Sequence, residues 1–222
     1  MPQLQVVIAS TRPGRAGLPI GRWAAETAAK HGGFDVELVD LEEMRLPLLD
    51  EPHHPRMRRY MKDHTLRWSK KVSAADAFVF VTPEYNYGPP PSLLNAIDFL
   101  HDEWAYKPVA FVSYGGVAAG LRSVQALKQV VTTLRMVPIP EGVAIPFVFE
   151  HLSPSGLQLP PRVAASVGPM VDELLRWTDA LQELRNSPLP SAPPPLPSAP
   201  LPPPDGRDLA VGAPSPVPPV SD

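Results

Sequence analysis

The sequence predicts an α/β fold in which five parallel strands form one sheet with helices on both faces. Short apolar runs alternate along the chain with longer amphipathic stretches, which is typical of repeated strand–helix–strand units. Three of the apolar runs end in polar loops that contain glycine or proline, as strand-to-helix connections often do. Because the crossovers in such units are right-handed, we expect the strand order 2-1-3-4-5.

The strands follow from the apolar runs. A β-branched run near the start of the chain and the later run Ala-Phe-Val-Phe-Val-Thr are typical of strands buried on both faces of a parallel sheet. In chain order, strands are expected near residues 4–9, 35–40, 77–82, 108–113 and 143–148.

The helices follow from apolar residues that recur every three or four positions. One such series is Leu121, Val124, Leu127 and Val131. In chain order, helices are expected near residues 17–31, 56–74, 91–103, 118–135 and 162–185. A dinucleotide-binding fold with similar elements is disfavoured, because no G-x-G-x-x-G pattern follows the first strand.

Proline usage predicts where the folded domain ends. Of the 32 prolines in 222 residues, 14 lie between Pro188 and Pro219, in a segment without aromatic residues. Such a segment cannot bury enough surface to offset the entropy lost on ordering. We therefore expect one domain over residues 1–186 and a disordered Pro-rich tail over residues 187–222.

Composition excludes several classes of function. The chain has no cysteine, which excludes disulfides, iron–sulfur clusters, thiolate nucleophiles and cysteine-based zinc sites. A net charge of −3 argues against a nucleic-acid-binding protein. The paired residues His53 and His54 have no partner at metal-ligand spacing, so no metal site is expected. No signal-like or membrane-spanning apolar run is visible, so a cytoplasmic location is expected and no membrane partner.

The loop after the first strand has the composition of a phosphate site. Ser10-Thr11-Arg12-Pro13-Gly14-Arg15 lies between that strand and a helix. This arrangement directs hydroxyls, guanidinium groups, backbone N–H groups and a helix N-terminus toward one point, where a phosphomonoester is favoured. The alternative is an ordinary turn in which a hydroxyl caps the helix.

Two more loops are expected at the same edge of the sheet. Pro83-Glu84-Tyr85-Asn86-Tyr87-Gly88 follows the third strand, and Ser113-Tyr114-Gly115-Gly116 follows the fourth. The carboxyl ends of parallel strands share one edge, so one ligand can contact all three loops. The aromatic and backbone groups of the later loops suit a planar ring, although the tyrosines also fit a role in packing.

These motifs resemble the NADPH-dependent FMN reductase family, a flavodoxin-like group that includes quinone, azo-dye and chromate reductases. The matching residues are Ser10-Thr11-Arg12, Pro83-Glu84-Tyr85-Asn86 with Leu94-Asn95-Ala96-Ile97-Asp98, and Gly115-Gly116 with Gly120. The similarity runs from about Leu4 to Phe147. It implies a flavodoxin-like three-layer fold, the cofactors FMN and NADPH, and a homodimer or homotetramer.

The resemblance also implies a reaction and a set of binding residues. NAD(P)H would reduce bound FMN, which then reduces a quinone, azo, metal or free-flavin acceptor. The flavin carries the chemistry, so no catalytic side chain is assigned. The predicted cofactor-binding residues are Ser10, Thr11, Arg12, Arg15, Gly17, Pro83, Glu84, Tyr85, Asn86, Ser113, Tyr114, Gly115 and Gly116. Arg15 is a candidate for the FMN phosphate or for the 2′-phosphate of NADPH, and Glu84 for ligand contact or for a structural role at a helix end.

Two other functions remain open at this level. One is an FMN-binding electron carrier or redox sensor that does not oxidise nicotinamide cofactors, although the mild net charge of −3 favours the enzyme. The other is an interaction protein that works through its Pro-rich tail. A spacer role for the tail is favoured over partner docking.

Overall fold

The computed structural model describes residues 1–154 and 156–190. Within it, residues Met1–Pro188 form one compact unit. The segment predicted to be a disordered tail lies outside the described residues from position 191 onward, so the proposed division into residues 1–186 and 187–222 stays a prediction.

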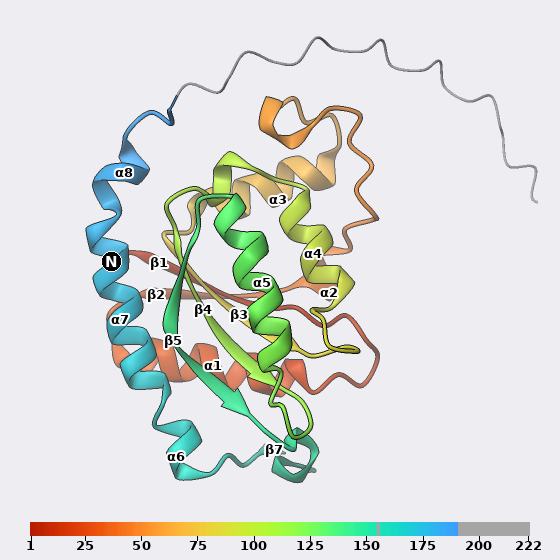
Figure 1. The fold of residues 1–222 in the computed structure, drawn as a ribbon, viewed down its shortest axis with the longest axis vertical. Helices are drawn as coiled ribbons and strands as arrows, with labels where there is room; N and C mark the ends of the chain where they lie inside the picture. Colours follow the sequence, from red (N-terminus) through yellow and green to blue (C-terminus); the bar gives the residue numbers. More distant parts are fainter. Residues whose placement is uncertain (155, 191–222) are drawn as a thin grey trace, which may run out of the picture. The chain divides into compact units, whose positions relative to one another are not determined.

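A five-stranded parallel sheet forms the centre of this unit (Figure 1). Its strand order is β2-β1-β3-β4-β5, which confirms the predicted order 2-1-3-4-5. The strands are β1 (Gln3–Ile8), β2 (Asp35–Asp40), β3 (Ala77–Pro83), β4 (Pro108–Tyr114) and β5 (Val137–Ile145). The separate pair β6 (Leu152–Ser153) and β7 (Gly156–Leu157) is antiparallel.

Helices cover both faces of the sheet. The α-helices are α1 (Gly17–His31), α2 (Leu41–Met44), α3 (Asp63–Ala74), α4 (Pro91–Asp98), α5 (Leu121–Thr133), α6 (Pro161–Ala164), α7 (Val167–Ala180) and α8 (Gln182–Asn186). Three short 3₁₀ helices are η1 (Pro55–Met57), η2 (Asp102–Trp104) and η3 (Val148–His151). In the part of the chain that the structure describes, no helix combines the length and the apolar character that crossing a bilayer requires.

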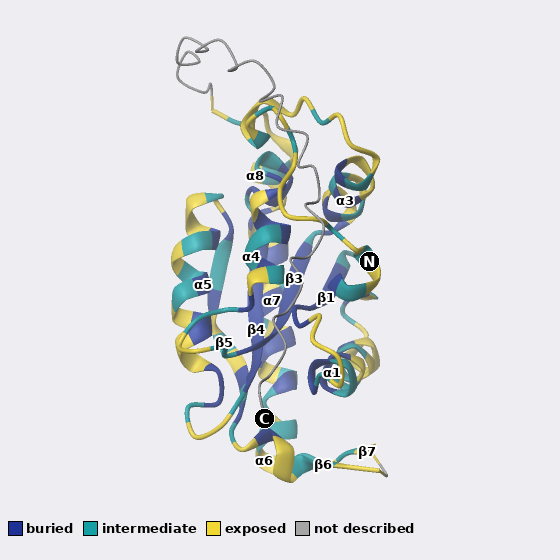
Figure 2. Cartoon of the chain, turned by 90° about the vertical axis from the view of Figure 1, so that its right-hand side faces the viewer, coloured by how far each residue is buried: buried dark blue, intermediate teal, exposed yellow. Residues whose placement is uncertain are grey.

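Two apolar cores lie on opposite faces of the sheet. One joins the strands to α1 and α7 and includes Ile20 and Val171. The other joins them to α3, α4 and α5 and is rich in aromatic side chains, among them Trp68, Phe80 and Trp104. Figure 2 shows the central strands as buried and the outer helix surfaces as exposed. Since β3 and β4 are buried along their whole length, the loops at their carboxyl ends start from rigid supports.

The last strand differs from the prediction. We expected a strand at 143–148, whereas β5 spans Val137–Ile145 and includes Pro138 and Pro140. Proline is tolerated because β5 is one of the two edge strands of the sheet. The pairing register shifts between Val109 and Phe111, and a Cβ at Gly142 would lie 2.8 Å from the carbonyl oxygen of Phe111.

Three stretches that were predicted as single helices are interrupted in the structure. The stretch 56–74 contains only η1 and α3, because Arg58 adopts a left-handed backbone and the Glu51 carboxylate accepts hydrogen bonds from the N–H groups of Met61 and Lys62. In the stretch 91–103 the α-helix ends at Asp98, and the separate 3₁₀ helix η2 begins at Asp102. The stretch 162–185 is divided into α6, α7 and α8.

Candidate functional site

The loops after β1, β3 and β4 meet at the carboxyl edge of the sheet and enclose a cavity of about 300 Å³. Residues of η3 complete its wall. Its lining comprises Ser10, Arg12, Pro13, Gly14, Arg15, Ala16, Pro83, Glu84, Tyr85, Tyr114, Gly115, Gly116, Val148 and Phe149. The volume lies at the low end of the range for small-molecule sites.

The first loop leads into the N-terminus of α1. Ala16 at the N-cap position makes no side-chain capping bond, and the first turn carries no acidic residue. The N–H groups at this helix end therefore lack the side-chain acceptor that often satisfies them. The guanidinium of Arg15 forms an ion pair with Asp40, while its Nε atom is buried without a hydrogen-bond partner. Together these groups make a corner of positive polarity with an unsatisfied donor.

Three hydroxyl-bearing side chains lie close together at the floor of the cavity. The Oγ atom of Ser10 and the hydroxyl of Tyr85 are 2.6 Å apart, and Ser10 is 1% exposed. Burial raises the pKa of Tyr114 further above its ordinary value, so its hydroxyl is a neutral group at this site. A Cβ at Gly17 would lie 2.7 Å from this hydroxyl oxygen. Gly17 thus lets α1 approach β4 closely, and it does not itself line the cavity.

The loop after β3 contains a tight turn from Tyr85 to Gly88. The N–H of each of these two residues donates to the carbonyl of the other, at 2.9 and 3.0 Å. Asn86 and Tyr87 both have positive φ values, 50° and 72°. Two bridging bonds around two left-handed residues are the geometry of a type I′ turn. Glu84, just before the turn, accepts hydrogen bonds from the backbone N–H of Arg122 at 3.2 Å and from its Nε at 2.6 Å.

The loop after β4 supplies a glycine wall. The N–H of Phe147 donates to the carbonyl of Gly116, and that of Val148 donates to the carbonyl of Gly115, at 3.2 and 3.0 Å. A Cβ at Gly116 would meet no atom within 4 Å, so its outer side is open space. Phe149 is 76% exposed beside this opening. An apolar rim therefore borders the glycine wall.

Most of the predicted binding residues lie together. Ser10, Arg12, Arg15, Pro83, Glu84, Tyr85, Tyr114, Gly115 and Gly116 all line the cavity. Thr11 lines a separate cavity of about 140 Å³ beside α2 and α4, and Asn86 lies on the turn outside the lining. Ser113 is a buried residue that lines a different cavity. Sequence reasoning missed Val148 and Phe149, which follow a strand that was itself placed too late.

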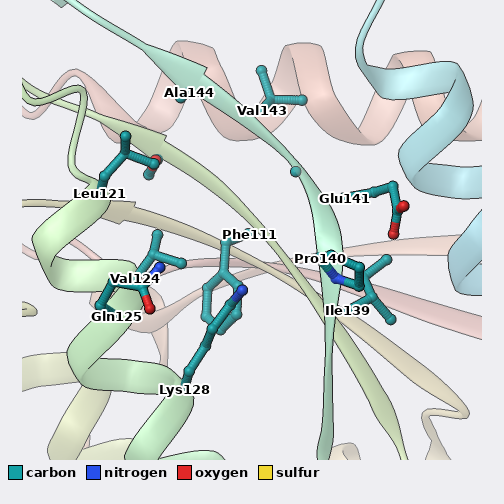
Figure 3. Close-up of a pocket in the computed structure, with 12 residues that line it drawn as sticks. Phe111, Leu121, Val124, Gln125, Lys128, Ile139, Pro140, Glu141, Val143 and Ala144 are labelled. Atoms are coloured by element: carbon teal, nitrogen blue, oxygen red, sulfur yellow. The ribbon is translucent and has the colours of Figure 1, made fainter.

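The cavity that Ser113 lines lies between α5 and β5 (Figure 3). It measures about 140 Å³ and combines aliphatic residues with Gln125 and Lys128 of α5. In Figure 3 the side chain of Glu141 points away from Lys128, so the two do not form a polar pair. Among residues 1–154 and 156–190, no three His, Asp or Glu side chains converge as a metal site.

Comparison with known proteins identifies similar sequences. Residues 2–150 match the family described as NADPH-dependent FMN reductase. A NAD(P)H-dependent FMN reductase of Schizosaccharomyces pombe is 42% identical over 137 residues, which cover 61% of this chain and 68% of the relative. A NAD(P)H:quinone oxidoreductase of Solanum tuberosum is 45% identical over 64 residues, 28% of this chain and 33% of the relative.

Comparison with solved structures identifies similar folds. The flavoenzyme NAD(P)H:(acceptor) oxidoreductase FerB of Paracoccus denitrificans superposes with a TM-score of 0.64 over 81% of this chain and 98% of its own. Its sequence identity is 21%, so this similarity concerns the fold.

Proposed function

The chain belongs to the NADPH-dependent FMN reductase family, and we propose that it binds FMN in the cavity formed by the loops after β1, β3 and β4. The protein is an FMN-dependent NAD(P)H oxidoreductase. One observation supports the proposed location above all others. Nine of the thirteen residues predicted to bind the cofactor line this one cavity, although they come from loops that follow three different strands.

The phosphate of FMN fits the corner made by the first loop. The uncapped N-terminus of α1 and the unpartnered Nε of Arg15 both lack an acceptor there. A phosphate oxygen supplies acceptors to both and interacts favourably with the helix dipole. We assign the phosphate to this corner, with Arg12 and the backbone around Gly14 at its edge. Of the two roles considered for Arg15, we assign it to the FMN phosphate, because its unpartnered Nε belongs to the same corner as the N-terminus of α1.

The isoalloxazine ring fits between the turn after Glu84 and the glycine wall. The open space above Gly116 leaves room for a flat ring, and a side chain at this position would occupy it. Tyr85 is held by the hydrogen bond between its hydroxyl and that of Ser10 at the floor of the cavity. Peptide groups of Pro83–Tyr85 and Gly115–Gly116 lie at the correct edge of the sheet to contact the polar end of the ring.

The protein contributes binding and orientation to the reaction. Bound FMN supplies the chemistry of hydride acceptance and electron donation. The residues of the phosphate corner would hold one end of the cofactor, and the Tyr85–Gly88 turn and the glycine wall would hold its ring. Neither a side-chain acid nor a base is required, so we assign no catalytic residue. The hydroxyl of the buried Tyr114, whose pKa is raised by burial, acts as a neutral hydrogen-bonding group.

The acceptor that we propose is a planar, partly apolar molecule such as a quinone. Phe147 and Phe149 are 49% and 76% exposed, and Phe149 lines the cavity. Exposed aromatic side chains beside an opening provide a surface on which a flat ring can stack. The potato relative that is a NAD(P)H:quinone oxidoreductase supports the same class of acceptor.

Two measurements on the purified chain test the proposal. We expect added FMN to bind with quenching of its fluorescence, and anaerobic NADPH then to bleach the visible absorbance of the bound flavin. Failure to bind FMN would remove the assignment of the cavity. Binding without bleaching would instead favour an electron carrier, which the family relationship does not favour.

Oligomeric state and location are further proposals from the sequence resemblance. We propose a homodimer or homotetramer in the cytoplasm, with residues 1–186 as the reductase domain and the Pro-rich segment as a tail. Sedimentation equilibrium of the full chain tests the assembly. Cell fractionation tests the location, and limited proteolysis tests the domain boundary.

A further inference from the structure

One side chain outside the cavity lining connects α5 to the turn after β3. The Arg122 guanidinium lies 3.8 Å from the centre of the Tyr87 ring, measured from Cζ. The same group pairs with the Glu84 carboxylate, with 2.6 Å between Nη2 and Oε1. Arg122 is in the first turn of α5, so the Glu84 carboxylate also lies at the favourable N-terminal end of that helix. Arg122 thus contacts the residues on both sides of Tyr85 and Asn86 in the sequence.

The turn requires such support because of its sequence. A type I′ turn needs positive φ at both central residues, and Asn-Gly is the pair that adopts it best. Here the pair is Asn86-Tyr87, and Tyr87 has a φ of 72°. A left-handed backbone is strained for a bulky residue and persists only where surrounding contacts hold it. Tyr87 is 71% exposed, so burial does not provide those contacts.

We propose that Arg122 is a positioning residue, which holds the Tyr85–Gly88 turn in its left-handed form by stacking on Tyr87 and pairing with Glu84. This inference rests on the proposed function, because the turn forms the wall assigned to the isoalloxazine ring. Arg122 acts through the turn and does not itself line the cavity. Its role is therefore to shape the ring wall, because the contacts described for it are with Glu84 and Tyr87 and not with the residues of the phosphate corner.

Arginine suits this role in a way that lysine does not. Its planar guanidinium can stack on an aromatic face and donate to a carboxylate with the same group. A lysine ammonium is a point charge that can pair with Glu84 but has no plane to lay on Tyr87. The neutral side chain of glutamine keeps an N–H donor for Glu84 and loses the cation above the ring.

The experiment compares four variants: R122Q, R122K, R122Q/Y87G and the control R176Q. The control removes an exposed arginine of α7 that pairs with Glu173, and neither of these residues lines the cavity. Equilibrium titration measures the Kd of FMN and of riboflavin, which has the ring but no phosphate. For R122Q we expect both Kd values to rise about tenfold, the factor equivalent to about 1.4 kcal/mol, with their ratio unchanged.

The double variant makes the test specific. Y87G creates the Asn-Gly pair that forms a type I′ turn without help. We therefore expect R122Q/Y87G to bind both flavins almost as tightly as the wild-type chain does. R122K should bind them more weakly than R122Q/Y87G. If R122Q binds both flavins as R176Q does, the proposal is wrong. It is also wrong if R122Q is weakened and Y87G gives no recovery, since a conformational role requires that recovery.

Hydrogen exchange separates this proposal from the proposed function. Should the wild-type chain bind neither flavin, the FMN site is refuted, and the role of Arg122 is then decided in the ligand-free protein. We expect faster amide exchange at Tyr85 and Gly88 in R122Q than in R176Q, because these two N–H groups close the turn. Equal exchange in the two variants would overturn the proposal.

Discussion

Replacing Arg15 with glutamine tests the phosphate corner directly. The Arg15 side chain is 14% exposed and pairs with Asp40, whose side chain is 6% exposed. Its Nε atom has no partner and is a donor that a phosphate oxygen would satisfy. Riboflavin has no phosphate, so the reasoning predicts that R15Q weakens FMN and leaves riboflavin unaffected.

The expected magnitude follows from the type of contact. A hydrogen bond to a charged group contributes about 1.5–3 kcal/mol. Asp40 already neutralises part of the Arg15 charge, which favours the lower part of that range, about 1.5–2 kcal/mol. Since about 1.4 kcal/mol corresponds to a tenfold change, the Kd of FMN should rise about 10- to 30-fold.

The assay is a fluorescence-quenching titration of each flavin with the apoprotein. R15Q leaves the Asp40 carboxylate without its partner, and this negative charge would itself repel a phosphate. The double variant R15Q/D40N removes that effect, and asparagine at position 40 can still accept the bond from the N–H of Glu42. A loss of FMN affinity of about tenfold should persist in the double variant. Full recovery there, or an equal loss for riboflavin in R15Q, would refute the assignment of Arg15 to the phosphate.

Three further predictions concern stability, pH and the acceptor. G120A should lower the free energy of unfolding by about 2–4 kcal/mol, because φ is +80° and the new Cβ would lie 2.8 Å from the backbone nitrogen of Tyr114. Urea denaturation measures this loss. The control is G14A, where φ is also positive but the new Cβ would meet no atom within 4 Å. An equal loss of stability in G120A and G14A would contradict the prediction. Burial lowers the pKa of Lys107 from 10.5 to about 8, so the folded state binds this proton more weakly than the unfolded state does. Burying the protonated amine destabilises the fold fully below pH 8 and progressively less toward pH 10.5. The free energy of unfolding should therefore rise with pH above 8. In urea titrations at several pH values, K107M should flatten that rise. F149A should raise the KM of a quinone several-fold and leave the KM of ferricyanide unchanged, because only the flat quinone ring can stack on Phe149. Steady-state kinetics measure both KM values. Equal changes for the two acceptors would argue against the apolar rim as the acceptor surface.

Tertiary structure decided several properties of the site that motifs could not indicate. The loop Ser10–Arg15 reads as a set of anion donors, yet the structure pairs Arg15 with Asp40 and places the Ser10 hydroxyl against Tyr85. The Glu84 carboxylate supports α5 through Arg122, which is 38 residues away in sequence. Each of these pairs joins separate strand–helix units. No local pattern encodes such a pairing, because it depends on which loops the strand order makes neighbours.

The sequence by itself determined the class of fold, the strand order and the three loops that converge. Apolar periodicity and turn residues act over a few positions, and handedness then restricts how the units connect. It did not determine the start of β5, where the edge position permits Pro138 and Pro140. Nor did it indicate that Phe149 borders the cavity or that Thr11 faces away from it. These features depend on the space left between packed elements, and only the folded chain defines that space.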